Sequence, residues 1–430
     1  MQKGKQKNRW LIALSAVAIH LSIGSVYAYS VYQLPLSEKF GWKTTDVSLA
    51  FTIAIFMLGT SAAFLGRFVE KHGPRKSALI AATFFGVGTI GSGFAVLSGS
   101  YVLFLFFFGF VAGIGLGIGY ISPVSTLVKW FPDRRGLATG MAVLGFGAGA
   151  LVTGPVAGKL MEVTSISNTF FILGTAYFVL MIAGASYLQK PEEGWMPAGM
   201  KEKISQGSVK VNQDLAQLTA SEAVRTARFW MLWLMMFINI SAGIMLLAVA
   251  SPMAQEITGM SALTAASVVG LLGLFNGGGR IGWASFSDYI GRANTYVVFF
   301  VIQVIAFLML PNISNQTFFP ILLYIIITCY GGGFACLPAF IGDLFGTKQL
   351  GAIHGYLLTS WSMAGVVGPM IVSAIYDKTK SYTVTFYIFT ALLVVALIVS
   401  LLMQLNIKKL KQEMQREVKG QGRVKQPITT

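Results

Sequence analysis

Apolar stretches about as long as a bilayer-crossing helix recur along the whole chain, with shorter polar segments between them. An α-helix rises 1.5 Å per residue, so about 20 apolar residues cross a hydrocarbon core of about 30 Å. The pattern predicts twelve membrane-spanning helices, near residues 10–33, 46–66, 78–98, 101–129, 137–160, 168–188, 229–254, 261–286, 294–310, 318–345, 350–373 and 382–406.

The longest polar interruption, residues 189–228, divides the twelve spans into two groups of six. Its charged residues and prolines predict a linker rather than a further span. We therefore expect an all-α polytopic membrane protein built from two six-helix bundles. The expected parts are a first bundle over 1–188, a cytoplasmic linker over 189–228, a second bundle over 229–406 and a basic cytoplasmic tail over 407–430.

Composition and charge agree with this class and set the orientation. The chain has 430 residues, of which 55% are hydrophobic and 11% charged, and its formal net charge is +16. In a soluble protein that charge would suggest nucleic acid, but here Lys and Arg gather in the N-terminal segment, the loops 67–76 and 129–135, the linker and the C-terminal tail. The positive-inside rule then predicts a multi-pass protein of the cell membrane with both termini cytoplasmic. The first apolar stretch is longer than that of a signal peptide, so we expect an uncleaved helix.

The two halves of the chain repeat each other. Four positions of the first half, Pro123, Gly136, Gly140 and Pro155, are answered about 215 residues later by Pro338, Gly351, Gly355 and Pro369. Six spans repeated in the same orientation predict two bundles related by an axis along the membrane normal. In such an architecture the substrate site lies between the bundles, near the middle of the bilayer.

Arg280 is the one Lys or Arg that this topology places inside the membrane, in a stretch (257–287) with no other charge. An arginine there costs roughly 2.5 to 3.5 kcal/mol and cannot lose its proton, so something must compensate it. Asn276 and three glycines precede it and would let a helix or a small anion approach closely. The arginine is either a site for a substrate carboxylate or one half of a structural ion pair with Asp343.

Two titratable residues within the spans are candidates for proton coupling, His20 and Asp343. A histidine at such a position is also common as a hydrogen-bonded contact between helices. Exchange of one anion for another needs no proton carrier, because the bound anion neutralises the arginine in both directions. Uniport, proton symport and antiport all fit the sequence.

Several segments resemble a known transporter family. Residues 66–76 (GRFVEKHGPRK) look like the signature loop between helices 2 and 3 of the major facilitator superfamily. Within it the chain is similar to the oxalate/formate antiporter family, through residues 8–10 (NRW), 130–138 (WFPDRRGLA), 274–280 (LFNGGGR) and 287–292 (SDYIGR). The resemblance spans helices 1 to 12 and implies alternating access. It also implies gating contacts that hold the bundles together on the cytoplasmic side, through Glu70, Arg75, Asp288 and Arg292.

The same resemblance implies a set of substrate-binding residues. Arg280 matches a carboxylate-binding arginine, and aromatic residues of both halves match cavity-lining positions: Tyr27, Tyr120, Tyr330 and Phe334. Oxalate carriers of the family add a lysine on helix 11, where this chain has Trp361. With one cation, a bound monocarboxylate leaves no net charge in a low-dielectric cavity, whereas oxalate leaves −1. Tyrosines and tryptophans of membrane helices also serve as interfacial anchors, which is the alternative explanation of these aromatics.

We therefore expect a secondary transporter of small carboxylates of the lactate, pyruvate or formate class, by proton symport or anion exchange. The alternatives are an oxalate:formate antiporter, or a drug or metabolite exporter of the same fold, which would favour acidic charge in its cavity. The glycines of residues 113–119 imitate a dinucleotide loop, but they lie inside a predicted helix and suit close helix packing. We expect no enzyme activity, cofactor or metal, no nucleic-acid partner, and function as a monomer.

Overall fold

The computed structural model describes residues 7–192, 194–200 and 214–423, and within them the regular elements are helices. Eleven of these helices are long and apolar enough to cross a membrane. A further one, α12 (Ala262–Ile290), has 29 residues but carries the polar Asn276 and Arg280, and it is not among the eleven. The predicted fold class, an all-α polytopic membrane protein, is confirmed.

The helices before the polar segment form the first bundle. Their bounds are α1 (Arg9–Ile23), η1 (Gly24–Ala28), α2 (Ser30–Phe40), α3 (Thr44–His72), α4 (Pro74–Ser98), α5 (Tyr101–Phe104), η2 (Leu105–Val111), α6 (Ala112–Trp130), α7 (Arg135–Val163) and α8 (Ile166–Tyr187). The segments α5, η2 and α6 run on as one span, Tyr101–Trp130.

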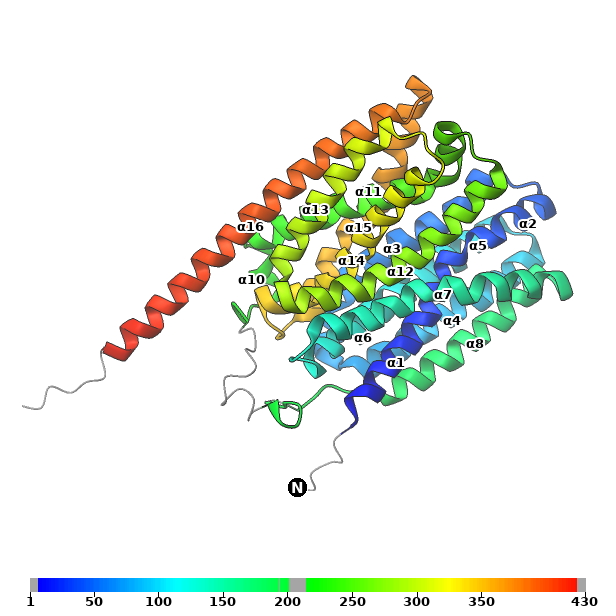
Figure 1. Cartoon of the computed structure of the whole chain (residues 1–430). Helices are drawn as coiled ribbons and strands as arrows, with labels where there is room; N and C mark the ends of the chain where they lie inside the picture. The colour runs from blue at the N-terminus through cyan, green and yellow to red at the C-terminus, as the bar shows by residue number, and fades with distance from the viewer. Residues whose placement is uncertain (1–6, 193, 201–213, 424–430) are drawn as a thin grey trace, which may run out of the picture.

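The second bundle follows after the short helix α10 (Ala220–Val224). It contains α11 (Ala227–Thr258), α12, α13 (Arg292–Met309), η3 (Leu310–Asn312), α14 (Phe318–Phe345), α15 (Leu350–Thr379) and α16 (Thr383–Arg423). Helix α16 continues beyond the predicted end of the last span and projects from the body (Figure 1). Strong helix formers and a Lys409–Glu413 pair at i, i+4 spacing support that extension.

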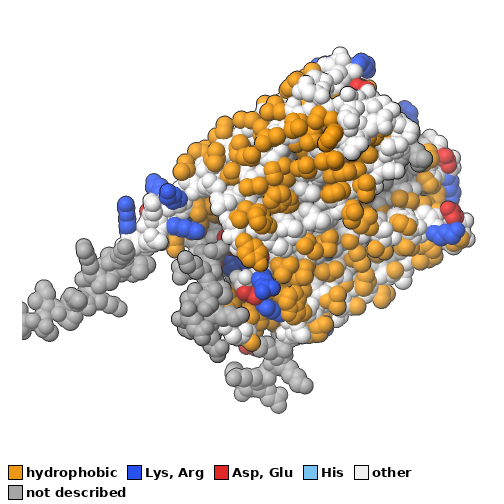
Figure 2. Space-filling view, viewed as in Figure 1, with side chains coloured by type: hydrophobic (Ala, Val, Ile, Leu, Met, Phe, Trp, Pro, Cys, Tyr) orange, Lys and Arg blue, Asp and Glu red, His pale blue; other side chains and the backbone are white. Residues whose placement is uncertain are grey.

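Figure 1 shows the two bundles side by side, with the described start of the chain and the projecting end of α16 at the same end of the molecule. We call this end the termini side. Between the bundles, α3 packs on α15 and α7 packs on α12. Figure 2 shows hydrophobic side chains over the visible flank, with charged side chains gathered toward the two ends. That distribution suits a protein surrounded by lipid.

The first span is broken in its middle by the 3₁₀ segment η1, and glycine allows the break to pack. A Cβ on Gly24 would lie 2.0 Å from the Phe146 carbonyl oxygen, so only glycine permits this approach of η1 to α7. Tyr27 lies in this 3₁₀ segment, and the segment packs against α7 of the same bundle. A side chain near the middle of the membrane is thereby fixed by a backbone contact.

The glycines of residues 113–119 serve helix packing, as expected. A Cβ on Gly113 would meet Met57 and Ala54 of α3, and one on Gly115 would meet the backbone of Phe85 in α4. These contacts let α6 lie close between two neighbours. Because α6 also carries Tyr120, the tight packing sets the position of that side chain between the bundles.

Candidate substrate site between the two bundles

Arg280 lies in the middle of α12, with a side chain only 1% exposed. Its Nε donates to the Asn276 side-chain oxygen one turn earlier at 3.2 Å, and its Nη1 donates to the Val143 carbonyl of α7 at 2.8 Å. Its Nη2 is buried and has no hydrogen-bond partner among the described residues. The arginine therefore links the two bundles through a neutral acceptor and keeps one donor unused.

Neutral groups surround this charge. The guanidinium carbon lies 5.8 Å from the ring centre of Phe146 and 5.7 Å from that of Phe334. Contacts of this kind contribute about 0.5 to 2 kcal/mol each, depending on desolvation. Among the described residues Arg280 forms no ion pair.

The alternative ion pair between Arg280 and Asp343 is wrong. Asp343 is bonded to Arg135 at 3.0 Å and faces Arg292 at 3.7 Å, both on the termini side. On α14 the residue beside Arg280 is Gly331, which also contacts Asn276. Asp343 follows twelve residues later, about 18 Å along the helix, too far for the guanidinium to reach.

Of the three glycines before Arg280, Gly279 is the one that admits a helix, since a Cβ on Gly278 would meet nothing within 4 Å. A Cβ on Gly279 would lie 2.4 Å from the Thr328 carbonyl oxygen of α14, and a Cβ on Gly331 would lie 2.3 Å from the Asn276 carbonyl. The two helices thus touch backbone to backbone beside the guanidinium. This contact holds the arginine against α7 and the space between the bundles.

Aromatic side chains of both bundles meet at Arg280. The central cluster, as we call it, consists of Tyr27, Tyr120, Phe146, Arg280, Tyr330, Phe334 and Trp361. The ring of Trp361 lies 4.5 Å from Phe334, 5.6 Å from Tyr120 and 6.4 Å from Tyr27. The structure therefore brings together the six substrate-binding residues expected from the sequence, although their binding role stays a prediction.

Several polar atoms of this cluster are buried and have no hydrogen-bond partner among the described residues. The hydroxyls of Tyr27, Tyr120 and Tyr330 and the Trp361 Nε1 have no hydrogen-bond partner among the described residues. The Tyr27 hydroxyl lies close to Tyr330 and Arg280 without a regular hydrogen bond. With the Arg280 Nη2, five atoms of this cluster that are able to donate are buried without a partner. Their complement is a group that only accepts, and an ionised carboxylate is such a group.

Two neighbouring tyrosines of the first span make contacts outside the central cluster. The Tyr29 hydroxyl donates to the Val47 carbonyl, and its ring packs on Phe108. The Tyr32 ring stacks on Phe170 at 4.6 Å. Of the three tyrosines on this span, Tyr27 is the one that faces Arg280.

The two proton-coupling candidates lie in different places. His20 is fully buried, with Nδ1 2.7 Å from the Ala142 carbonyl oxygen and Nε2 3.1 Å from that of Tyr120. Its ring stacks on Tyr120, beside the central cluster. Asp343 belongs instead to the termini-side ion pairs. His20 thus has the contacts of a histidine that joins helices, and its coupling role stays a prediction.

Glu70 joins the bundles on the termini side. Its carboxylate accepts from the backbone N–H of Gly351 at 2.7 Å and from the Lys129 ammonium at 3.0 Å. Gly351 is the second residue of α15, so the carboxylate caps the positive end of a helix in the opposite bundle. The close approach of α3 there leaves a Cβ on Gly66 no room beside Ala352.

Asp288 makes the corresponding contact in the other direction. Its two oxygens accept from the backbone N–H groups of Gly136 at 2.9 Å and Leu137 at 3.1 Å, at the start of α7. Arg292 also donates to it. The sequence repeat is therefore realised as two crossed contacts between bundles. Arg75, the fourth expected gating residue, is exposed and forms no ion pair among the described residues.

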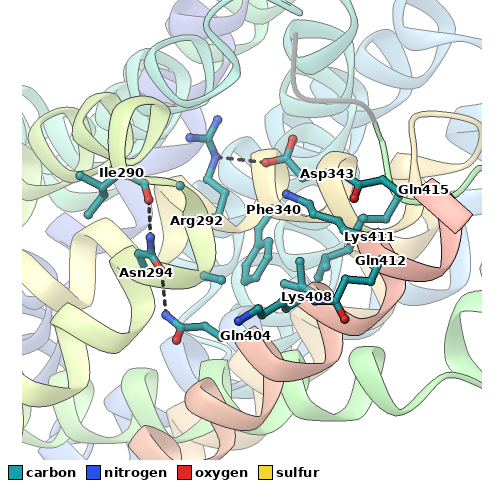
Figure 3. A pocket seen from close by; sticks show the side chains of 15 residues that line it. Ile290, Arg292, Asn294, Phe340, Asp343, Gln404, Lys408, Lys411, Gln412 and Gln415 are labelled. Atoms are coloured by element: carbon teal, nitrogen blue, oxygen red, sulfur yellow. Dashed lines mark hydrogen bonds and ion pairs between the residues drawn. The ribbon is translucent and has the colours of Figure 1, made fainter. Parts of the chain in front are cut away.

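A further ion-pair cluster strengthens the same end. Arg135 donates to Asp214 at 2.6 Å and to Asp343 of the second bundle at 3.0 Å. Figure 3 shows Arg292 pointing to Asp343 beside Lys408 and Lys411 of the α16 extension, around a cavity of about 470 Å³. We call these contacts together with those of Glu70 and Asp288 the latch.

Three residues of the centre were not expected from the sequence. Phe146 contacts Arg280, Tyr27 and Trp361, Asn276 holds the Arg280 Nε, and His354 packs against Tyr120. Asn276 precedes Arg280 by one turn and His354 precedes Trp361 by two, so helical spacing was a usable signal for both. Nothing in the sequence distinguishes Phe146 from the other phenylalanines.

Comparisons with known proteins agree with this fold. The family model described as Major Facilitator Superfamily matches residues 13–339 and 283–429. An oxalate:formate antiporter of Oxalobacter formigenes is 30% identical over 376 residues, covering 86% of this chain and 85% of that protein. Monocarboxylate transporter 14 of Mus musculus is 22% identical over 489 residues, covering 96% and 93%.

Solved structures show the same fold at low sequence identity. The E. coli fucose:proton symporter superposes with a TM-score of 0.71 and 13% identity, over 92% of this chain and 99% of that one. The twelve long helices, the crossed contacts of the latch and the family match lead to one conclusion: the chain belongs to the major facilitator superfamily.

Proposed function

We propose that this protein is a secondary transporter that carries a small carboxylate anion across the cytoplasmic membrane by alternating access. The observation that carries the proposal is the buried Arg280, which has no acidic partner in the described part of the chain and an unused Nη2. Tyr27, Tyr330 and Trp361 of the same cluster also carry buried polar atoms without a partner there. A carboxylate supplies the missing negative charge and accepts from several of these donors at once.

The charge count favours a monocarboxylate. Arg280 is the one cation of the central cluster, so a lactate-, pyruvate- or formate-like anion brings the site to zero net charge. Oxalate would leave one uncompensated negative charge away from water. The relatives named as an oxalate:formate antiporter and a monocarboxylate transporter support a carboxylate substrate. Oxalate:formate exchange is therefore the second candidate, whereas the absence of an acidic side chain from the central cluster disfavours an exporter of cationic drugs.

Binding also affects how the bundles are held. The Arg280 Nη1 bonds to the Val143 carbonyl of the opposite bundle. A carboxylate that takes two adjacent guanidinium donors competes with that carbonyl and exchanges a neutral bond for a charge-assisted one. The substrate thereby loosens a contact in the centre while the latch holds the termini side shut. The bundles then rock about the site.

The cation bias of the loops supports an orientation with the termini side in the cytoplasm. In this orientation the latch closes the cytoplasmic entrance. The single chain holds the whole central cluster, which suits a functional monomer. Proton symport and anion exchange both use the site as described.

The test is uptake of labelled lactate, pyruvate, formate and oxalate into proteoliposomes. Each acid is measured with and without an inward proton gradient and with and without anion inside. Saturable uptake of a monocarboxylate, stronger than that of oxalate and absent from Arg280→Gln, supports the proposal. Wild-type protein that moves none of the acids, or an Arg280→Gln variant as active as wild type, overturns it.

A further inference from the structure

His354 is the most unusual polar side chain of the membrane interior. It lies in α15, is 0% exposed, and neither ring nitrogen has a hydrogen-bond partner among the described residues. The other two histidines differ: both nitrogens of His20 face carbonyl oxygens, and His72 is exposed with Nδ1 3.2 Å from the Phe68 carbonyl. An imidazole that is buried with both nitrogens unused destabilises this conformation, in which the latch is closed, compared with an apolar ring of similar size. Packing alone therefore does not account for a histidine here.

The position of His354 connects two parts of the molecule. Its ring makes a T-shaped contact with Tyr120, with centroids 5.7 Å apart, and Trp361 follows two turns later on the same face of α15. Gly351, which donates to Glu70 in the latch, lies one turn earlier. The imidazole thus stands between the central cluster and the latch.

A cavity of about 710 Å³ opens on the latch side of this histidine. It is lined by Glu70, Lys129, Arg135 and Gln349, among others, and Gln349 is the residue before the first turn of α15. His354 lies one turn after Gly351, the residue that holds Glu70, so a separation of the bundles at this contact would bring water toward the imidazole.

Few charges act on this imidazole directly. A protonated His20 of α1 would repel the protonated form of His354. The ring of Tyr120 of α6 contacts the His354 ring. On the other elements packed against α15, Glu70 of α3 is held by Gly351 and Lys129, Arg228 of α11 lies over Phe345, and Asp343 of α14 is bonded to Arg135. The charges of α16 lie on its extension, and Arg67 of α3 lies 5.9 Å from the Tyr356 ring.

We propose that His354 binds the proton that crosses together with the carboxylate, an inference that rests on the proposed function. The neutral imidazole uses the lone pair of one ring nitrogen to accept a proton from hydronium on one side of the membrane, which leaves water, and it returns the proton to water on the other side, which restores hydronium. A carboxylate on Arg280 brings negative charge into the cluster that Tyr120 shares with His354, which favours the imidazolium. By linkage, the proton strengthens anion binding by the same factor.

The test separates coupling from transport. Wild type, His354→Gln and the control His72→Gln, at the exposed histidine of α3, are reconstituted, and labelled lactate, pyruvate and formate are measured in two assays. One assay follows exchange against internal acid at equal pH, and the other follows uptake driven by an inward proton gradient. We expect the gradient to stimulate wild type and His72→Gln by about 10-fold, and His354→Gln by less than about 2-fold, with exchange within about 3-fold of wild type.

A second readout does not depend on vesicles. When lactate is added to detergent-purified protein in weak buffer, wild type should take up about one proton per protein. His354→Gln should take up none. If the glutamine variant unfolds, both assays are repeated with His354→Phe, whose ring fills the same volume without a titratable group.

The outcomes are distinguishable. A His354→Gln or His354→Phe variant that keeps gradient stimulation overturns this inference, as does wild type that exchanges acids but ignores the gradient, and in both cases the proposed function stands. Wild type that neither exchanges nor accumulates any of the acids overturns both.

Discussion

The latch and the central cluster treat buried polar groups in opposite ways. In the latch each carboxylate meets donors: Glu70 meets Gly351 and Lys129, and Asp288 meets the start of α7. In the central cluster the charged Arg280 has neutral neighbours, and several donors have no acceptor. Satisfied groups stabilise one conformation, whereas unsatisfied groups stabilise whatever supplies the missing acceptor. The first region is built to hold and the second to bind.

Removing the cation of the central cluster is the largest perturbation of this contrast. We expect Arg280→Gln to lower transport by about 100-fold or more, because the variant loses the charge that compensates a desolvated carboxylate. Arg280→Lys keeps the charge without the planar fork and should remain severely impaired. Uptake assays measure both variants. The amount of protein in the membrane fraction checks insertion, and gel filtration of the purified protein checks folding. Near-normal transport by the glutamine variant would remove the central cluster from the substrate path.

Adding a second cation to the same region should change the preferred substrate. Trp361→Lys offers oxalate another charge-assisted hydrogen bond, which contributes roughly 1.5 to 3 kcal/mol, or about 10- to 100-fold. The lost indole packing lowers all rates, so the quantity to measure is the ratio of oxalate to lactate uptake. Trp233→Lys, on α11 and bonded to Thr359, is the control and should leave the ratio unchanged. A wild type that already prefers oxalate over every monocarboxylate would contradict the charge argument.

Removing single tyrosine hydroxyls sharpens the contrast. The loss of a hydrogen-bonded hydroxyl should lower the stability of the protein, whereas the loss of an unbonded one should not. Tyr330→Phe removes an unpartnered hydroxyl, so Tm should stay or rise while apparent affinity falls by about 10-fold. Tyr296→Phe removes a hydroxyl that donates to the Gly333 carbonyl at 2.8 Å and should cost about 1 kcal/mol of stability with little effect on affinity. Thermal unfolding and substrate titration compare the two. Equal losses of Tm in both would mean that the central hydroxyls are structurally bonded.

Weakening the latch should have the smallest effect. Asp288→Asn weakens a partly exposed contact by about 1 kcal/mol, which shifts the population several-fold toward the state open on the termini side. Labelling of cysteines introduced on either side of the central cluster reports the shift. Arg75→Gln is the matched control, since Arg75 is exposed and forms no described ion pair, and it should label like wild type. Identical labelling of Asp288→Asn and wild type would show that the latch does not set the balance.

The helices were predictable because their signal is local. A run of apolar residues long enough for the bilayer needs no partner to be recognised, and the same holds for a lone arginine such as Arg280 within it. The resemblance to a known family even indicated that Glu70 and Asp288 both take part in gating contacts. Their shared partner, the start of a helix in the opposite bundle, follows only from the folded chain.

The partners of buried polar groups were harder to foresee. Asp343 was matched with Arg280 on the rule that membrane charges pair, yet it pairs with Arg135, which the sequence places in a loop. The rule holds for Asp343 and not for Arg280, which forms no ion pair among the described residues, and it cannot say which cation lies at the same depth until helix lengths and tilts are known. His354 was overlooked for a similar reason: a histidine is recognised as unpartnered only when its surroundings are visible.

The crossing of the two latch contacts has a statistical consequence. Glu70 reaches from the first bundle to the second and Asp288 from the second to the first, so a rotation that separates the bundles on this side stretches both together. An opening that separates the bundles therefore strains both contacts in the same motion, and once one breaks the other carries the load alone. Distances measured across this entrance on single molecules should therefore fall into two separate peaks rather than one broad distribution, with Asp288→Asn changing the weights of the peaks and not their positions.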